Sequence, residues 1–204
     1  VADGIKLFLK EDIIPALADK WLFIQAPVLV FCGAFLAYVA IPFAPGWVVA
    51  DLNIGVFYIL AVSALVAIGI IMAGWASHNK WSLYGAMRTA AQFLSYEIPS
   101  ALHLMPAVMM AGSLHLGTIV ESQETGLFGL GGIFGWYAFQ NPFLFLSFLC
   151  YYISSLAETN RTPFDLPETE SELVAGFHTE YTGMRFSFFF MAEYADMFVV
   201  SALI

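Results

Sequence analysis

Residues 157–186 read AETNRTPFDLPETESELVAGFHTEYTGMRF and form a hydrophilic stretch in a very apolar chain. The stretch carries six of the sixteen acidic residues, namely Glu158, Asp165, Glu168, Glu170, Glu172 and Glu180. Two arginines oppose them, and an apolar run long enough to cross a bilayer lies on each side. Carboxylates are costly near hydrocarbon. A solvated run of charges is one interpretation, but the interleaved prolines and apolar residues favour an acidic loop folded onto another surface.

The composition is that of a membrane protein. Hydrophobic residues make up 60% of the 204 residues and charged residues only 11%, whereas soluble domains are about one quarter charged. The apolar runs are continuous rather than alternating, which predicts helices and not a β-barrel. A net charge of −9 does not suit nucleic-acid binding. Cys32 and Cys150 lie in apolar runs without a CxxC motif, so we predict no metal, iron–sulfur or haem site.

These features predict an all-α polytopic membrane protein with one membrane domain over residues 1–204. Residues 1–20 are expected to form an interfacial amphipathic helix that breaks near Pro15. Residues 114–140 are expected to be a flexible connection, and residues 158–185 the structured acidic loop. Val1 is not an initiator methionine and Ile204 ends an apolar run, so we expect an internal piece of a longer protein. Five spanning helices are predicted, over residues 21–43, 54–76, 83–113, 133–157 and 186–204.

The basic residues predict the orientation. Counted from the N-terminal segment, successive loops carry 3, 0, 2, 0 and 2 of them. Positive residues collect on the cytoplasmic side of a membrane. The N-terminal segment, the 77–88 region and the acidic loop are therefore predicted to be cytoplasmic, where His78 and His178 are expected to be solvated.

Four carboxyl groups lie in or beside the predicted spans: Glu97, Glu158, Glu193 and Asp196. Charge is costly at membrane depth, so such a group can hold a proton near neutral pH and release it when a neighbour changes, as a proton relay requires. Glu193 and Asp196 are three residues apart and share one helix face. Arg88 and Glu97 are nine apart, on opposite faces of one helix, so Glu97 needs a partner from another element or must stay protonated. The structural alternative is a buried carboxyl that hydrogen-bonds a neighbouring helix.

Residues 157–186 resemble the signature loop of the membrane subunit of respiratory complex I that borders the quinone site, which is the H subunit of the bacterial enzyme and the first subunit of the mitochondrial one. The resemblance continues at collinear positions through ADGIKLFLKED at 2–12, GWASHNKWSLYGAMRTAAQFLSYEIP at 74–99 and FFMAEYADMFVVSAL at 189–203. Pro167 and the HTEY at 178–181 resemble the bacterial form.

The resemblance implies a multi-pass subunit of a proton-pumping NADH:quinone oxidoreductase in a bacterial plasma membrane. It implies quinone as substrate, at an interface with the partner subunits that carry the electrons, and no redox centre in this chain. The buried acids would form the proton relay. The residues implied at the quinone site and coupling loop are Lys6, Arg161, Asp165, Glu168, Glu170, Glu172 and Glu180.

Three alternatives remain at this point. The first is the related membrane subunit of an energy-converting hydrogenase, or of a complex fed by ferredoxin or a deazaflavin. The second is a stand-alone ion-coupled transporter, although the sequence shows no inverted repeat. The third is a passive membrane anchor, for which neutralising Glu97 or Glu193 would leave activity intact.

Overall fold

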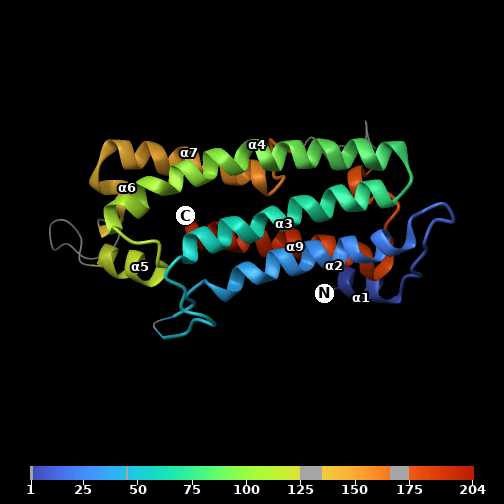
Figure 1. Cartoon of the computed structure of the whole chain (residues 1–204), viewed down its shortest axis with the longest axis horizontal. Coiled ribbons are helices and arrows are strands. Elements are labelled where there is room, and N and C mark those ends of the chain that lie inside the picture. Colours follow the sequence, from blue (N-terminus) through green and yellow to red (C-terminus); the bar gives the residue numbers. More distant parts are fainter. Residues whose placement is uncertain (1, 45, 125–134, 166–174) are drawn as a thin grey trace.

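The computed structural model describes residues 2–44, 46–124, 135–165 and 175–204, and the regular elements in these ranges are helices (Figure 1). Ala44 and Trp47 form an isolated antiparallel β-bridge in the loop between η1 and α3. In chain order the helices are α1 (Ala2–Leu9), α2 (Lys20–Leu36), η1 (Ala37–Val39), α3 (Gly55–Ala76), α4 (Lys80–Ala111), α5 (Leu116–Glu124), α6 (Tyr137–Gln140), α7 (Pro142–Glu158), η3 (Gly176–His178) and α9 (Gly183–Leu203).

Within the part of the chain that the structure describes, three helical stretches are long and apolar enough to cross a membrane: Lys20–Val39, Gly55–Ala76 and Gly183–Leu203. A fourth candidate is α4 together with α5, which are bent by 61° relative to each other. Helix α7 is apolar but has only 17 residues. The predicted all-α membrane protein is therefore confirmed, while the count of five spans stays a prediction.

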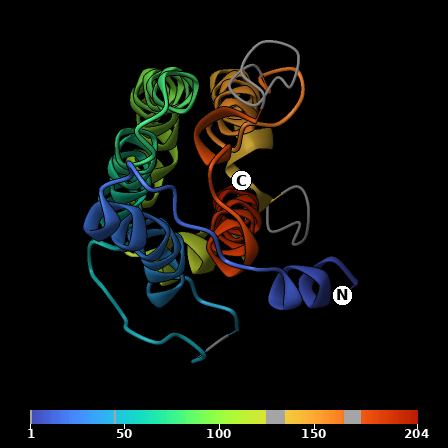
Figure 2. The same ribbon diagram turned by 90° about the vertical axis from the view of Figure 1, so that its right-hand side faces the viewer.

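The long helices form an elongated bundle (Figure 1), which is turned by 90° in Figure 2. Helix α3 packs between α2 and α4, α7 lies against α4, and α9 lies against α2. Helices α7 and α9 make hardly any contact with each other.

Small residues set the close helix contacts. A Cβ on Gly69 of α3 would lie 2.4 Å from a methyl group of Val30 on α2. A Cβ on Gly74 would lie 2.3 Å from the Cβ of Ala86 on α4. Membrane helices approach closely where small residues remove side-chain bulk. Glycine at these two positions thus holds α3 against both neighbours.

The N-terminal helix is shorter than predicted. Helix α1 ends at Leu9, well before Pro15, and the backbone then runs in extended form. The Ile13 N–H donates to the Thr182 hydroxyl at 3.1 Å, and that hydroxyl donates to the Glu11 carbonyl at 3.2 Å. The prediction that the helix continues to a break near Pro15 was wrong. The contacts with Thr182, at the start of α9, require extended backbone at Glu11 and Ile13, so the helix ends before them.

Two boundaries at the opposite end also differ from prediction. Residues 114–140 are not simply a connection, because α5 occupies Leu116–Glu124, and the Thr118 N–H donates to Nδ1 of His115 at 3.0 Å as a cap. The predicted helix over 133–157 is broken at Asn141, whose backbone is extended. Its side chain accepts from the Phe143 N–H at 3.0 Å, and Pro142 begins α7. Proline favours this first helical position because it has no N–H to satisfy.

Candidate functional site

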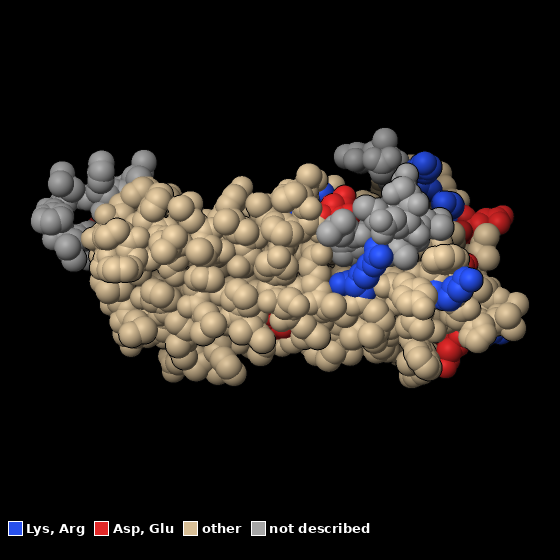
Figure 3. Space-filling view, turned by 90° about the horizontal axis from the view of Figure 1, so that it is seen from above, with Lys and Arg blue, Asp and Glu red and all other residues tan. Residues whose placement is uncertain are grey.

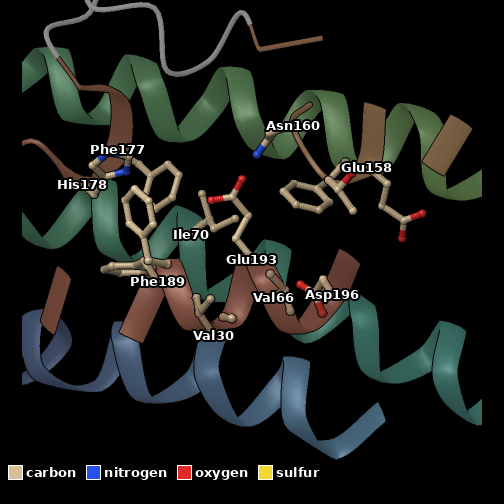
Figure 4. Close-up of a pocket in the computed structure, with 14 residues that line it drawn as sticks. Val30, Val66, Ile70, Glu158, Asn160, Phe177, His178, Phe189, Glu193 and Asp196 are labelled. Carbon is tan, nitrogen blue, oxygen red and sulfur yellow. The ribbon is translucent and has the colours of Figure 1, made fainter. Parts of the chain in front are cut away.

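A small cavity of about 30 Å³ lies between α7 and α9 and brings together three of the predicted acids (Figure 4). Glu158 enters it from the end of α7, and Glu193 and Asp196 enter from α9. In Figure 4 the Glu193 carboxylate points from α9 toward Asn160, and Asp196 lies farther along the helix on the Glu158 side. The rest of the wall is largely apolar, with Val30, Val66, Ile70, Phe93, Phe177, Phe189, Phe190 and Ala192. Carboxyl groups in such a wall interact strongly because little water screens them.

Helix α9 packs against α2, and the Tyr38 hydroxyl of η1 donates to the Ala195 carbonyl at 2.9 Å. This contact helps to set the rotation of α9. Glu193 and Asp196, three residues apart on one helix face, then both line the cavity.

Glu158 lies halfway along α4 because α7 is much shorter than α4. The Ser100 hydroxyl donates to Oε2 of Glu158 at 3.3 Å. A second small cavity, also of about 30 Å³, is lined by Ser63, Ser100, Glu158 and Asp196 among others. Glu158 and Asp196 therefore line both cavities and stand where the two adjoin.

Glu97 is the fourth predicted relay acid and lies one turn before Ser100 on α4. It is partly buried and lies near Ser63 on α3, whose hydroxyl donates to the Leu60 carbonyl at 2.9 Å. Ser63 lines the second cavity, so polar groups continue from Glu97 to the Glu158 end.

Arg161 supplies positive charge to the cluster. Its Nη2 atom lies 3.4 Å from Oε1 of Glu193. Its Nε atom lies 3.0 Å from the sulfur of Met197, and its guanidinium lies over the ring of Tyr194 at 5.2 Å. The ion pair joins the acidic loop to α9.

The first part of the loop is fastened to α4 by Gln92. The Gln92 side-chain amide donates to the Ala157 carbonyl at 2.7 Å, to Oδ1 of Asn160 at 3.0 Å and to the Phe164 carbonyl at 2.9 Å. Asn160 has a positive φ of 48°, a conformation that asparagine tolerates better than most residues. The turn after Glu158 is thus held in place, and with it the direction of the carboxyl.

The last part of the loop is fastened to the start of α4. The Ser82 hydroxyl donates to the Phe177 carbonyl at 2.8 Å, and the Asn79 amide donates to Oε1 of Glu180 at 2.6 Å. Gly85 leaves no room for a Cβ, which would lie 2.6 Å from the carbonyl carbon of Gly176. The last described part of the loop therefore packs on the start of α4, while residues 166–174 of the predicted folded loop lie outside the described residues.

His178 was expected to be solvated, and this was wrong. It is only 8% exposed and lines the first cavity. Phe177 and Phe186 contact it edge to face at centroid distances of 4.9 and 5.1 Å. Burial lowers the pKa of His178 to about 4, so the ring is neutral near pH 7. The neighbouring phenylalanines in the sequence were the available signal for burial.

The other predicted site residues lie apart from the cavity. Asp165 and Lys6 are exposed, and Glu180 is held by Asn79. Glu168, Glu170 and Glu172 lie outside the described residues. Viewed from above, most of the visible charges gather toward one end of the molecule, and a small patch of acidic atoms shows near its middle (Figure 3). Sequence reasoning missed Ser100, Gln92 and Asn160, whose neutral side chains carry no signal of their own.

The described ranges contain no group of three His, Cys, Asp or Glu residues arranged to hold a metal ion. Carboxyl groups, the imidazole of His178 and the hydroxyl of Thr159 line the cavity, and the Arg161 guanidinium lies beside Glu193. Carboxyl groups can hold and pass protons. Such a cluster changes its charge when a neighbouring charge moves.

Comparisons with known proteins agree with this picture. A family model described as NADH dehydrogenase matches residues 1–204. The H subunit of NADH-quinone oxidoreductase from Chlorobaculum parvum is 53% identical over 204 residues, which are 100% of this chain and 56% of that protein. Proteins of the same name from Anaeromyxobacter dehalogenans and Bacillus mycoides are each 50% identical over all of this chain, which covers 48% and 58% of their lengths. The chain spans about half the length of the curated relatives it matches.

Proposed function

This chain belongs to the NADH dehydrogenase family, and we propose that it forms the part of an NADH:quinone oxidoreductase membrane subunit that couples quinone reduction to proton movement. The observation that carries the proposal is the cavity shared by Glu158, Glu193 and Asp196, with Arg161 reaching into the cluster from the acidic loop. The names of the relatives supply NADH and quinone as the reactants.

The electrons would come from a partner subunit, and this chain would handle protons. Reduction of a quinone to a quinol takes up two electrons and two protons. Proton uptake near the acidic loop changes the charge carried by Asp165 and the neighbouring acids. A unit charge at about 4 Å and an effective dielectric constant of about 20 is worth about 4 kcal/mol. A change of this size is enough to redistribute protons among Glu193, Asp196 and Glu158.

Each relay acid then has a distinct place. Glu193 lies nearest the loop, through its ion pair with Arg161. Asp196 and Glu158 stand between the two cavities. Glu97 lies beyond them on α4 and carries the charge change away from the loop. In this proposal the acids pass a change of protonation along the middle of the bundle.

The proposed orientation places the acidic loop on the cytoplasmic side. Contacts between the three predicted cytoplasmic segments support it. The Asp19 N–H donates to the Ala76 carbonyl at 3.1 Å, Asn79 bonds Glu180, and Ile13 bonds Thr182. Segments that must share one side of a membrane thus lie at one end of the bundle.

The test uses the full-length gene in native membranes, with Glu158→Gln and Asp165→Asn. NADH-driven reduction of a short-chain quinone and proton uptake into vesicles are measured, and blotting checks that the complex assembles. We expect Asp165→Asn to lose quinone reduction and Glu158→Gln to lose proton movement. Glu121→Gln, an exposed acid on α5, is the matched control. Near-normal pumping in Glu158→Gln would refute its relay role.

The same membranes separate the nearest alternative. A subunit of an energy-converting hydrogenase shares the expected fold but does not act with NADH and quinone. Wild-type membranes without any inhibitor-sensitive NADH:quinone activity would favour that alternative.

A further inference from the structure

A third cavity, of about 190 Å³, has walls from α4, α5, α6, α7 and the end of α9. Helices α5 and α6 lie at the opposite end of the molecule from α1 (Figure 1). The wall is mainly apolar but includes the polar side chains of His103, Gln123, Ser147 and Tyr151. A space of about 10–15 Å³ with polar partners holds one water molecule. This cavity therefore has the size and the polar groups to hold several.

Tyr151 of α7 stands between the third cavity and the second one. It is only 4% exposed and lines both cavities, and Leu203 of α9 is the other described residue that does so. A leucine side chain cannot carry a proton, whereas a phenol hydroxyl can both donate and accept a hydrogen bond. Tyr151 is therefore the polar group that separates the space beside Glu158 from the space at the far end of the bundle.

Glu158 lies two helical turns after Tyr151, so the two residues share one face of α7. Both line the second cavity, and Glu158 acts electrostatically on the Tyr151 hydroxyl. In Figure 4 the Glu158 carboxylate points away from Glu193. The Cα atoms of Glu158 and Tyr151 are about 10 Å apart along the helix, which two long side chains and one water molecule can bridge.

His103 of α4 lines the third cavity together with Tyr151. The Ser147 hydroxyl, one turn before Tyr151 on α7, donates to the His103 carbonyl at 2.9 Å. Three residues before His103, Ser100 donates to Glu158. Helices α4 and α7 are thus joined on both sides of Tyr151. An imidazole can bind a proton at one ring nitrogen and release one from the other, so a group suited to proton transfer lies beyond Tyr151.

We propose that Tyr151 and His103 form a second branch of the relay, beside the one through Glu97, and pass protons from Glu158 to the third cavity. The Tyr151 oxygen accepts a proton from the Glu158 side while its own proton leaves to the His103 side, so the hydroxyl is restored. Glu158 remains as a carboxylate until it receives the next proton. The His103 imidazole takes up the proton at one nitrogen and releases one from the other. This inference rests on the proposed function, because Glu158 must first receive its proton there.

The first experiment asks whether water reaches the third cavity in the full-length protein, and it needs no enzyme activity. Cys32 and Cys150 are changed to alanine. The purified complex with His103→Cys is treated with a small, charged methanethiosulfonate reagent, and mass spectrometry of the digested subunit locates the product. We expect labelling of His103→Cys and of Glu121→Cys, an exposed position on α5, but not of Thr89→Cys, which is fully buried on α4. Labelling of Glu121→Cys without labelling of His103→Cys would overturn the proposal.

The second experiment measures the protons moved per electron in native membranes. Tyr151→Phe keeps the ring and its packing and removes only the hydroxyl. It should retain NADH-driven quinone reduction in uncoupled membranes but move fewer protons per electron, and His103→Gln should do the same. Tyr152→Phe is the matched control, because Tyr152 is the next residue on α7 but is 47% exposed, and it should match wild type. Equal ratios in Tyr151→Phe and Tyr152→Phe would overturn the branch.

Failure of this branch can be told apart from failure of the proposed function. If Glu158→Gln loses proton movement and Tyr151→Phe does not, the relay stands and the branch through Tyr151 is refuted. If Glu158→Gln moves protons normally, the relay itself fails, and the branch fails with it.

Discussion

The Ser100 hydroxyl donates a hydrogen bond of 3.3 Å to Oε2 of Glu158, which joins the middle of α4 to the last residue of α7. The two residues are 58 positions apart in the chain. Ser100 is almost completely buried, and both residues line the second cavity. A small hydroxyl from a long helix therefore holds a carboxyl group at the point where the two cavities adjoin.

Ser100→Ala should slow proton movement without preventing assembly. The loss of one long hydrogen bond to an ionisable group costs about 1 kcal/mol, equivalent to about a fivefold change in rate. Proton uptake by membrane vesicles measures the effect. Ser95→Ala is the matched control, because Ser95 is exposed on the same helix and donates only to its own backbone, at the Ala91 carbonyl. Equal rates in the two variants would argue against a role for Ser100.

His178 should make the protein less stable as the pH falls. Burial lowers its pKa to about 4 from the ordinary value of 6.5, so the unfolded chain binds a proton in the window between these values that the folded chain does not. Stability is therefore full above the unfolded pKa and declines as the pH falls toward the folded one. Between about pH 7 and about pH 5 the loss is about 2 kcal/mol.

Thermal unfolding in detergent at the two pH values tests this contribution. His178→Gln removes the titrating ring and should show a smaller drop in melting temperature on acidification than wild type. His78→Asn is the control, since His78 is exposed and asparagine tolerates its positive φ of 49°. An identical pH response in wild type and His178→Gln would contradict the prediction.

Gly85→Ala should loosen the end of the acidic loop. The added Cβ would meet backbone atoms of Gly176 and Phe177 at 2.6 to 2.7 Å, and backbone cannot rotate away as a side chain can. Overpacking of this kind costs about 1–3 kcal/mol. The melting temperature and limited proteolysis of residues 158–185 report the change. Gly4→Ala has open space around its Cβ and should leave both measurements unaltered.

Gln92→Leu should release the beginning of the loop. It removes a side-chain amide that serves three acceptors, two of which are backbone carbonyls. Unsatisfied buried acceptors cost about 1–3 kcal/mol each, although water will reach some of these. Hydrogen–deuterium exchange of residues 157–164 should become faster. Exchange at wild-type rates would show that the turn after Glu158 does not depend on Gln92.

Several features of the site could be predicted from the spacing and type of neighbouring residues in the sequence. Glu193 and Asp196 are three residues apart, so any helix there brings them to one face, as α9 does. The interleaved apolar residues of the acidic loop indicated packing, and Phe177 is indeed buried. The early end of α1 was not accessible, because it depends on Thr182, which is 169 residues away from Ile13. The burial of His178 likewise depends on Phe186 of α9.

The sequence by itself determined that the chain is an α-helical membrane protein, where its acids lie along the helices, and which family its loop resembles. Hydrophobic run length and helical period are local properties, so they can be read without knowing any neighbour. Only the tertiary structure decided that Ser100 meets Glu158 and that Arg161 meets Glu193. Those contacts depend on two features of the packing. Glycines such as Gly69 let the helices approach closely, and the end of α7 at Glu158 sets which part of α4 that carboxyl group reaches. Carboxyl groups scattered over three helices become one site because of that packing.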